Sequence, residues 1–282
     1  MPSPPETLRM GAGTQARLAD ALRQLPDVPV QTVTFVGSSV AGLDAMQRGT
    51  TNIGIIMADV AYRAFSGQEH DSTVAPFHQL RGIAVLNLNT LHFVAAAHTR
   101  ISSIGDLRGL QVALGPSGSA TALITELLLN SSGLAASDVR GLILPYPEVS
   151  RRLASGELDA AFMTFVPPGE SVLTATGSGA RLVDLEGPSI ERLRLRYPFL
   201  QSTLIPGGTY PGQVNPIRTL GVDLLLVCRA DLDDKVVYRL AKAYFEALQR
   251  SAPATDFERA PATPIPLHPG AARYYRERAL SR

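Results

Sequence analysis

"LQVALGPSGSATALITELLL", residues 110–129, is the stretch that decides the fold class. Its first part is short and apolar, as in a buried strand, and its last part carries apolar residues at helical spacing. Glycine and serine separate the two parts. A strand that turns directly into a helix is the repeating step of α/β proteins. The N–H groups at the start of such a helix can hold an anion, and small residues let the anion approach the backbone.

The same step recurs along the chain, and it follows one plan in both halves. Apolar runs precede helical patterns at "VQTVTFVG", "NIGIIMA" and "LDAAFMTF". In "MQRGTTNIGIIMAD" and "LASGELDAAFMTF" a helix ends on a glycine, Gly49 or Gly156, and Asn52 or Asp159 follows three residues later. We therefore expect two α/β lobes, each a mixed sheet flanked by helices, with a ligand cleft between them.

Two segments are suited to cross between the lobes. "IAVLNLNTLHFVAAA" reads as two strands or as one long bent strand, and "IPGGTYPGQVNP" reads as a loop between two strands. Further on, "DDKVVYRLAKAYFEALQR" predicts an amphipathic helix, and "HPGAARYYRERAL" a final helix with Pro269 in its first turn. The predicted organisation is lobe I at 1–95 plus 219–282 and lobe II at 96–218, with crossings near 90–98 and 205–220.

Composition excludes several classes of protein. Hydrophobic residues make up 45% of the 282 residues and the net charge is +1, which argues against disorder and against nucleic-acid binding. Runs such as "LGVDLLLV" are too short to span a bilayer, so we expect no membrane insertion. The opening "MPSPPETLRMGAG" lacks the pattern of a secretory signal, which fits a cytosolic chain or a mature form without its leader. The single cysteine, Cys228, lies in an apolar run and is interpreted as structural.

The strand-to-helix turns supply the candidate ligand-binding residues. "GPSGSATA" lacks the lysine of a nucleotide-binding loop and the final glycine of a nucleophile elbow; the alternative to an anion site is a helix cap by Ser117 or Ser119. Asp59 either caps the helix after it or faces the cleft, and Tyr62 one turn on either packs or reaches the cleft. The candidates from these turns are Gly13, Thr14, Gln15, Gly37, Ser38, Ser39, Asp59, Tyr62, Ser117, Gly118, Ser119 and Thr121.

Catalytic chemistry finds little support in the sequence. The five histidines show no metal-ligand spacing, and no acid and base pair is placed to act on one substrate. We expect no metal, no cofactor and no enzyme activity.

Four blocks in order resemble the solute-binding subunits of tripartite ATP-independent periplasmic (TRAP) transporters of the TAXI class. They are "GSSVAGLDAMQRGTTNIGIIMADVAYRAFSG", "SIGDLRGLQVALGPSGSATA", "IPGGTYPGQVNPIRTLGV" and "PLHPGAARYY". The resemblance implies a type II-like, two-lobed periplasmic-binding-protein fold that closes on a solute and delivers it to a TRAP permease. It also implies a periplasmic location and a small carboxylate solute such as glutamate, glutamine or 2-oxoglutarate.

The resemblance also implies further site residues. Thr164 and Phe165 match the strand end that faces the cleft in the family, and Tyr210 matches the Gly-Thr-Tyr-Pro segment. Thr90 completes the predicted set. Three departures leave the solute identity open: Gln15 at an aromatic position, Met57 at a frequent glutamine, and Ala41–Gly42 where the family has an acidic residue.

Three alternatives remain open at this point. The first is a receptor for an ABC importer of a sulfonate or a thiamine precursor. The second is an enzyme, such as a lyase or transferase, that uses the same cleft. The third, the effector domain of a transcription regulator, is disfavoured because no helix-turn-helix segment or basic patch precedes the α/β region.

Overall fold

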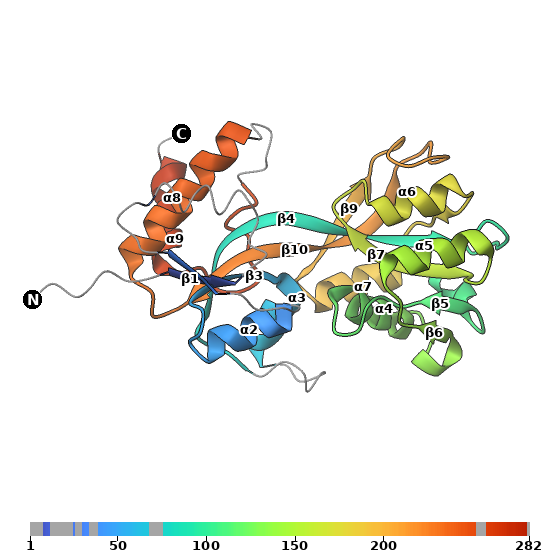
Figure 1. The fold of residues 1–282 in the computed structure, drawn as a ribbon, viewed down its shortest axis with the longest axis horizontal. Helices are drawn as coiled ribbons and strands as arrows, with labels where there is room; N and C mark the ends of the chain where they lie inside the picture. Colours follow the sequence, from blue (N-terminus) through green and yellow to red (C-terminus); the bar gives the residue numbers. More distant parts are fainter. Residues whose placement is uncertain are drawn as a thin grey trace, which may run out of the picture. The chain divides into compact units, whose positions relative to one another are not determined.

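The computed structural model describes residues 8–11, 25, 30–33, 39–67, 76–251 and 258–280 (Figure 1). The chain divides into two compact units: unit 1 is Met1–Asn87 with Leu224–Arg282, and unit 2 is Leu88–Asp223. The lobe boundaries predicted from the sequence were at 95/96 and 218/219. In the structure the division falls inside two long strands, after Asn87 and after Asp223.

These two strands carry the chain from one unit into the other. β4 (Leu80–Ala95) is one continuous strand, which resolves the alternative left open above, and β10 (Ile217–Arg229) is its neighbour in the sheet. Both ends of β4 are buried, whereas residues 87–89 in its middle are only half-buried. Continuous apolar runs of this kind are typical of strands covered on both faces.

Unit 1 is a mixed sheet with helices on both sides. Its strands β1 (Leu8–Gly11), β2 (Val30–Val33) and β3 (Ile53–Met57) are parallel, and β10 runs antiparallel to β3 with Leu226 opposite Ile55. The strand order is β2-β1-β3-β10-β4. Figure 1 shows α2 (Ser39–Gln47) and α3 (Ala58–Ser66) on one side of the strands, and α8 (Asp234–Ser251) and α9 (Pro269–Leu280) on the other.

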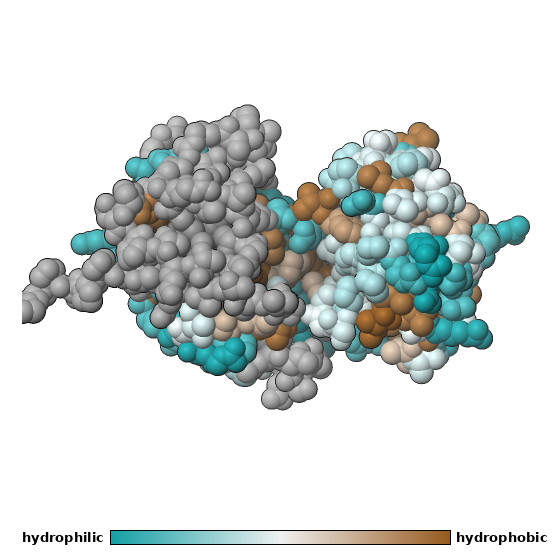
Figure 2. Space-filling view, in the orientation of Figure 1, coloured by the Kyte–Doolittle hydropathy of each residue, from teal (hydrophilic) through white to brown (hydrophobic). Residues whose placement is uncertain are grey.

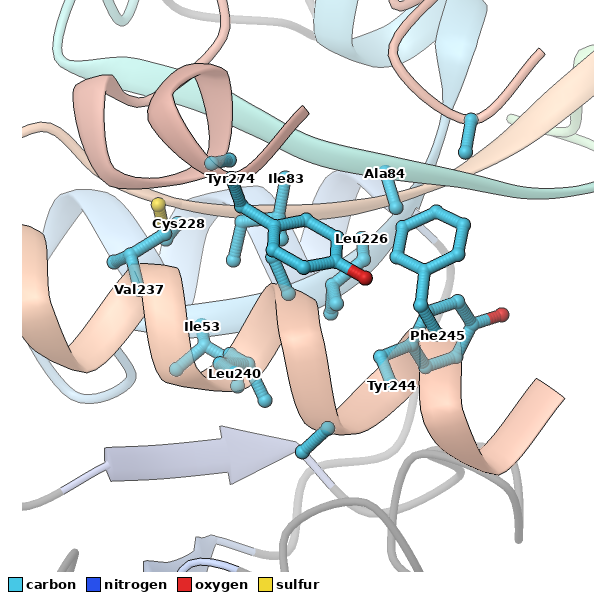
Figure 3. Close-up of a cluster of buried hydrophobic side chains, with 14 of the residues drawn as sticks. Ile53, Ile83, Ala84, Leu226, Cys228, Val237, Leu240, Tyr244, Phe245 and Tyr274 are labelled. Carbon is cyan, nitrogen blue, oxygen red and sulfur yellow. The ribbon is translucent and has the colours of Figure 1, made fainter. Parts of the chain in front are cut away.

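The core of unit 1 lies between its sheet and its last two helices. Ile53, Leu226 and Cys228 come from the strands and meet Leu240 and Phe245 of α8 (Figure 3). Cys228 is fully buried, as predicted. Tyr274 of α9 joins the same cluster. The two predicted C-terminal helices are therefore confirmed, and Pro269 begins α9 as expected.

Unit 2 repeats the mixed architecture with its own strands. β5 (Gln111–Ala113), β6 (Arg140–Leu142) and β7 (Ala160–Phe165) are parallel, and β7 runs antiparallel to β4. The order is β10-β4-β7-β5-β6, with β8 (Arg181–Leu182) paired to β4 and β9 (Leu200–Ile205) paired to β10. The loop predicted around "GGTYPGQ" connects β9 to β10.

The helices of unit 2 pack in two pairs. Figure 1 shows α4 (Ala120–Ser131) with α7 (Pro188–Arg196), and α5 (Tyr146–Ser155) with α6 (Glu170–Gly177). Two short 3-10 helices, η1 (Ile104–Leu107) and η2 (Ala136–Asp138), complete the unit. The shared glycine plan is confirmed: Gly49 and Gly156 have φ of 71° and 77°, the left-handed conformation that follows a helix end.

The visible surface of unit 2 carries apolar residues as separate patches. Figure 2 shows these patches surrounded by polar residues on the face that it presents. Scattered surface hydrophobic residues of this kind are ordinary in soluble proteins. Within the part of the chain that the structure describes, no helix combines the length and apolar character that crossing a membrane requires.

Candidate functional site

The turn before α4 is shaped by glycine and by a helix cap. This "α4 turn", residues 114–119, joins β5 to α4, and its Gly115 and Gly118 have φ of 102° and 68°. A β-carbon on Gly115 would lie 2.7 Å from Cγ2 of Thr121 and 2.9 Å from the amide nitrogen of Ala122. The turn therefore needs glycine at 115 for space as well as for backbone conformation.

Ser119 is the N-cap of α4, and its hydroxyl is used within the turn. The Ala122 N–H donates to Ser119 Oγ at 3.2 Å, while the Ser119 hydroxyl donates to the Pro116 carbonyl at 2.6 Å. The cap interpretation of Ser119 is confirmed. A cap satisfies one donor of the first turn, and the N–H groups of Ala120 and Thr121 have no acceptor within the helix. These donors, at the positive end of the helix, suit an anionic oxygen.

Three hydroxyl groups meet beside this helix start and form what we call the hydroxyl cluster: Thr121, Tyr146 and Thr164. Thr121 Oγ1 lies 2.7 Å from Tyr146 Oη and 2.7 Å from Thr164 Oγ1. The Thr164 N–H also donates to Tyr146 Oη at 3.3 Å. Each hydroxyl–hydroxyl contact uses one hydrogen, so two contacts use two of the three hydroxyl hydrogens. One hydroxyl hydrogen therefore remains for an acceptor outside the cluster.

The end of β7, where Thr164 and Phe165 lie, also adjoins a buried pair of aromatic side chains, His92 and Tyr210. The Gly169 N–H donates to Tyr210 Oη at 2.8 Å, and the same oxygen lies 2.7 Å from His92 Nε2. Both side chains are almost wholly buried. Burial lowers the pKa of His92 to about 4, so its ring is neutral at neutral pH. Tyr210, predicted as a site residue, thus has its hydroxyl bound to two groups of the protein.

Of the predicted residues of unit 1, the structure describes Ser39 at the start of α2 and Asp59 and Tyr62 in α3. The Met57 N–H donates to Ser39 Oγ at 3.0 Å, and Tyr62 is half-buried on the helix. The suggestion that Asp59 caps α3 is wrong: β3 runs directly into the helix, Met57 occupies the cap position, and Asp59 falls inside the first turn.

Asp59 is fully buried, and its Oδ1 has no hydrogen-bond partner among the described residues. Its Oδ2 lies 3.4 Å from the Arg63 guanidinium. Burial raises the pKa of Asp59, and the positive charge of Arg63 opposes that shift. The cleft role predicted for Asp59 stays a prediction.

The structure brings together only part of the predicted set. Thr121 and Thr164 are in direct contact, Phe165 adjoins them, and Ser117, Gly118 and Ser119 belong to the α4 turn. Thr90 is buried in β4. Gly13, Thr14, Gln15, Gly37 and Ser38 lie outside the described residues.

Tyr146 was missed by the sequence prediction. It begins α5 directly after "LILP", so it stands at a strand-to-helix turn of the same kind, but one without the glycine and serine that marked the others. The position of Tyr146 between a strand and a helix was the sequence signal that could have identified it as a site residue.

Two surface cavities of unit 2 contain no predicted residue. One of about 580 Å³ is lined by residues that include Ser102, Asp184 and Ser189, and one of about 590 Å³ by residues that include Thr176 and Gln213. Arg181 lines both, but its guanidinium donates to backbone carbonyls, including that of Ile101 at 2.8 Å. No group of three histidine, cysteine or acidic side chains that could hold a metal occurs among the described residues.

Comparison with known proteins identifies the fold as that of periplasmic solute-binding proteins. The aliphatic sulphonate binding protein SsuA from Escherichia coli is 16% identical, with a TM-score of 0.55, covering 97% of this chain and 84% of that one. SsuA from Xanthomonas axonopodis pv. citri, bound to MOPS, is 18% identical (TM-score 0.51; 96% and 83% covered). XAC2383 from Xanthomonas citri, bound to ATP, is 15% identical (TM-score 0.59; 96% and 95% covered).

The chain belongs to the NMT1-like family, whose model matches residues 16–278. The mixed α/β periplasmic-binding-protein fold predicted from the sequence is confirmed by the structural matches. The finer assignment to the TAXI class of TRAP transporters is not shown by these matches.

Proposed function

We propose that this protein is a periplasmic receptor that binds a small solute with a sulfonate group and delivers it to the membrane permease of an ABC importer. The observation that carries the proposal is the fold match along 97% of the chain to a sulphonate-binding protein. Membership of the NMT1-like family over residues 16–278 agrees with a solute-binding role.

The α4 turn is the proposed contact for the anionic group. It offers the N–H groups at the start of α4 together with the spare hydroxyl hydrogen of the hydroxyl cluster. All of these are donors, and a sulfonate or carboxylate presents only acceptors. The same donors could bind a carboxylate, the solute predicted from the sequence for a receptor that feeds a TRAP permease. The solute panel must therefore contain both kinds of anion.

The test is a thermal-shift and calorimetric titration of protein that has been unfolded and refolded to remove carried-over solute. Ethanesulfonate, taurine, glutamate and 2-oxoglutarate form the panel, with ethanol and ethylamine as controls that lack the anion. A sulfonate at a hundredfold excess over its Kd should stabilise the protein by about 2.7 kcal/mol and raise its Tm by roughly 5–11 °C. Stabilisation by a carboxylate alone would return the carboxylate receptor to first place. If no anion binds at millimolar concentration, the proposal fails.

A further inference from the structure

Gly169 lies unusually close to the ring of Phe165. It is the N-cap of α6 with φ of −88° and ψ of 131°, a conformation open to any residue, so backbone freedom does not explain a glycine there. A β-carbon at this position would lie 2.5 Å from Cγ and from Cδ2 of Phe165. The ring occupies the space that any other side chain would need.

The ring of Phe165 in turn packs against the hydroxyl cluster. Its centroid lies 4.8 Å from that of Tyr146, with the two rings tilted by 54°. Tyr146 Oη holds both the Thr121 hydroxyl and the Thr164 N–H. A displaced Phe165 ring would therefore move the Tyr146 ring and weaken both of these contacts.

Phe165 also neighbours the buried pair, His92 and Tyr210. The His92 ring lies 6.1 Å from that of Phe165, and Tyr210 Oη, which contacts His92, holds the Gly169 N–H. Phe165 thus neighbours Tyr146, His92 and Gly169. Its side chain is half-buried, and a shift away from a new β-carbon at 169 would disturb its packing against Tyr146.

We propose that Gly169 and Phe165 are positioning residues for the α4 turn site: their close contact sets the place of the Tyr146 hydroxyl. The solute-binding part of this inference rests on the proposed function. The positional part concerns only the protein and is tested without any solute.

The first measurement is amide hydrogen exchange at Thr164, whose N–H reports on its acceptor, Tyr146 Oη. Gly169→Ala should speed this exchange about tenfold, the factor that corresponds to losing 1.4 kcal/mol of local protection. Gly177→Ala is the matched control, because Gly177 ends the same helix and a β-carbon there meets nothing within 4 Å. Equal exchange in the two variants would overturn the inference.

The second measurement separates positioning from general destabilisation. In a Phe165→Ala background the Cγ and Cδ2 atoms that lie 2.5 Å from the new β-carbon are gone, so adding Gly169→Ala should speed Thr164 exchange by less than about threefold. An undiminished effect of Gly169→Ala in that background would refute the role given to Phe165. If Gly169→Ala alone does not fold, Phe165→Ala should still speed Thr164 exchange, and unchanged exchange there would refute the role of Phe165 equally.

The third measurement uses ethanesulfonate as the probe. Gly169→Ala should weaken its binding about tenfold, while Gly177→Ala should leave the Kd unchanged. Binding by wild type that Gly169→Ala does not weaken would overturn the inference and leave the proposed function standing. Faster exchange in Gly169→Ala, together with no binding of any panel anion by wild type, would refute the proposed function and uphold the positional part.

Discussion

The two glycines of the α4 turn provide a matched pair of perturbations. Gly115→Ala and Gly118→Ala each place a β-carbon on a residue with positive φ, which costs a non-glycine residue about 1–2 kcal/mol. Only at Gly115 does the new carbon also meet other atoms, at 2.7 Å from Thr121 Cγ2 and 2.9 Å from the Ala122 nitrogen. At Gly118 it meets nothing within 4 Å.

The difference in space predicts a difference in stability. Overpacking costs about 1–3 kcal/mol in addition to the backbone term, so Gly115→Ala should lose about 3 kcal/mol and Gly118→Ala about 1 kcal/mol. At roughly 2–4 °C per kcal/mol, these losses correspond to a fall in Tm of about 6–12 °C and 2–4 °C. Gly115→Ala should also weaken ethanesulfonate binding, because Thr121 and the first N–H groups of α4 must shift.

The assay is thermal unfolding of both variants beside wild type, followed by calorimetric titration well below the lower Tm. If Gly115→Ala melts within about 2 °C of Gly118→Ala, the close approach of Gly115 to the first turn of α4 has no energetic weight. That outcome would also remove the reason for placing the anion at this turn.

Three further predictions concern other parts of the molecule. Tyr146→Phe should lose about 1–3 kcal/mol in urea unfolding, because the half-buried Thr164 N–H loses its acceptor, whereas Tyr197→Phe should lose less than about 0.5 kcal/mol. Because the folded pKa of His92 is lowered to about 4, the unfolded chain binds a proton first as pH falls, so stability should decline between pH 6.5 and 4. In His92→Gln the free energy of unfolding should fall between pH 7 and pH 4 by about 3 kcal/mol less than in wild type. An equal fall in the two proteins would contradict the lowered pKa of His92. Gly270→Ala should destabilise unit 1 by more than about 2 kcal/mol, since a β-carbon there overlaps the Asp234 carbonyl oxygen. The folded variant should keep its affinity for ethanesulfonate, because the α4 turn belongs to unit 2. A weakened affinity would contradict the placement of the site in unit 2 alone.

Much of the fold could be predicted because the strand-to-helix step depends on residues that are close together in the sequence. Hydrophobic period and the glycines at helix ends are properties of neighbouring residues, which is why α8, α9 and the plan around Gly49 and Gly156 were found. The continuity of β4 was harder to predict, because an apolar run with asparagines in its middle is compatible with one long strand or with two shorter ones. Its single-strand form depends on pairing partners that are distant in sequence.

The site was less predictable because its contacts are long-range. Thr121 could be proposed from its local turn pattern and Thr164 from the family resemblance, but the tyrosine that contacts both lies 25 and 18 residues away from them. His92 and Tyr210 are separated by 118 residues, and neither sequence neighbourhood indicates the other. For Asp59 the sequence left a helix cap and a cleft role open; the cap is excluded because β3 and α3 are directly continuous and Met57 is the N-cap.

The division of the chain within β4 and β10 has a consequence for the order of events during synthesis. Unit 2 is one uninterrupted segment, Leu88–Asp223, so all of it has been synthesised before α8 and α9 of unit 1. Unit 1 cannot complete its fold until these later elements are synthesised. The edge of β3 stays unpaired until β10 is present, and one side of the sheet of unit 1 stays uncovered until α8 and α9 pack on it. A nascent chain therefore carries an incomplete N-terminal half for most of translation, and that half is where a holding chaperone would be needed.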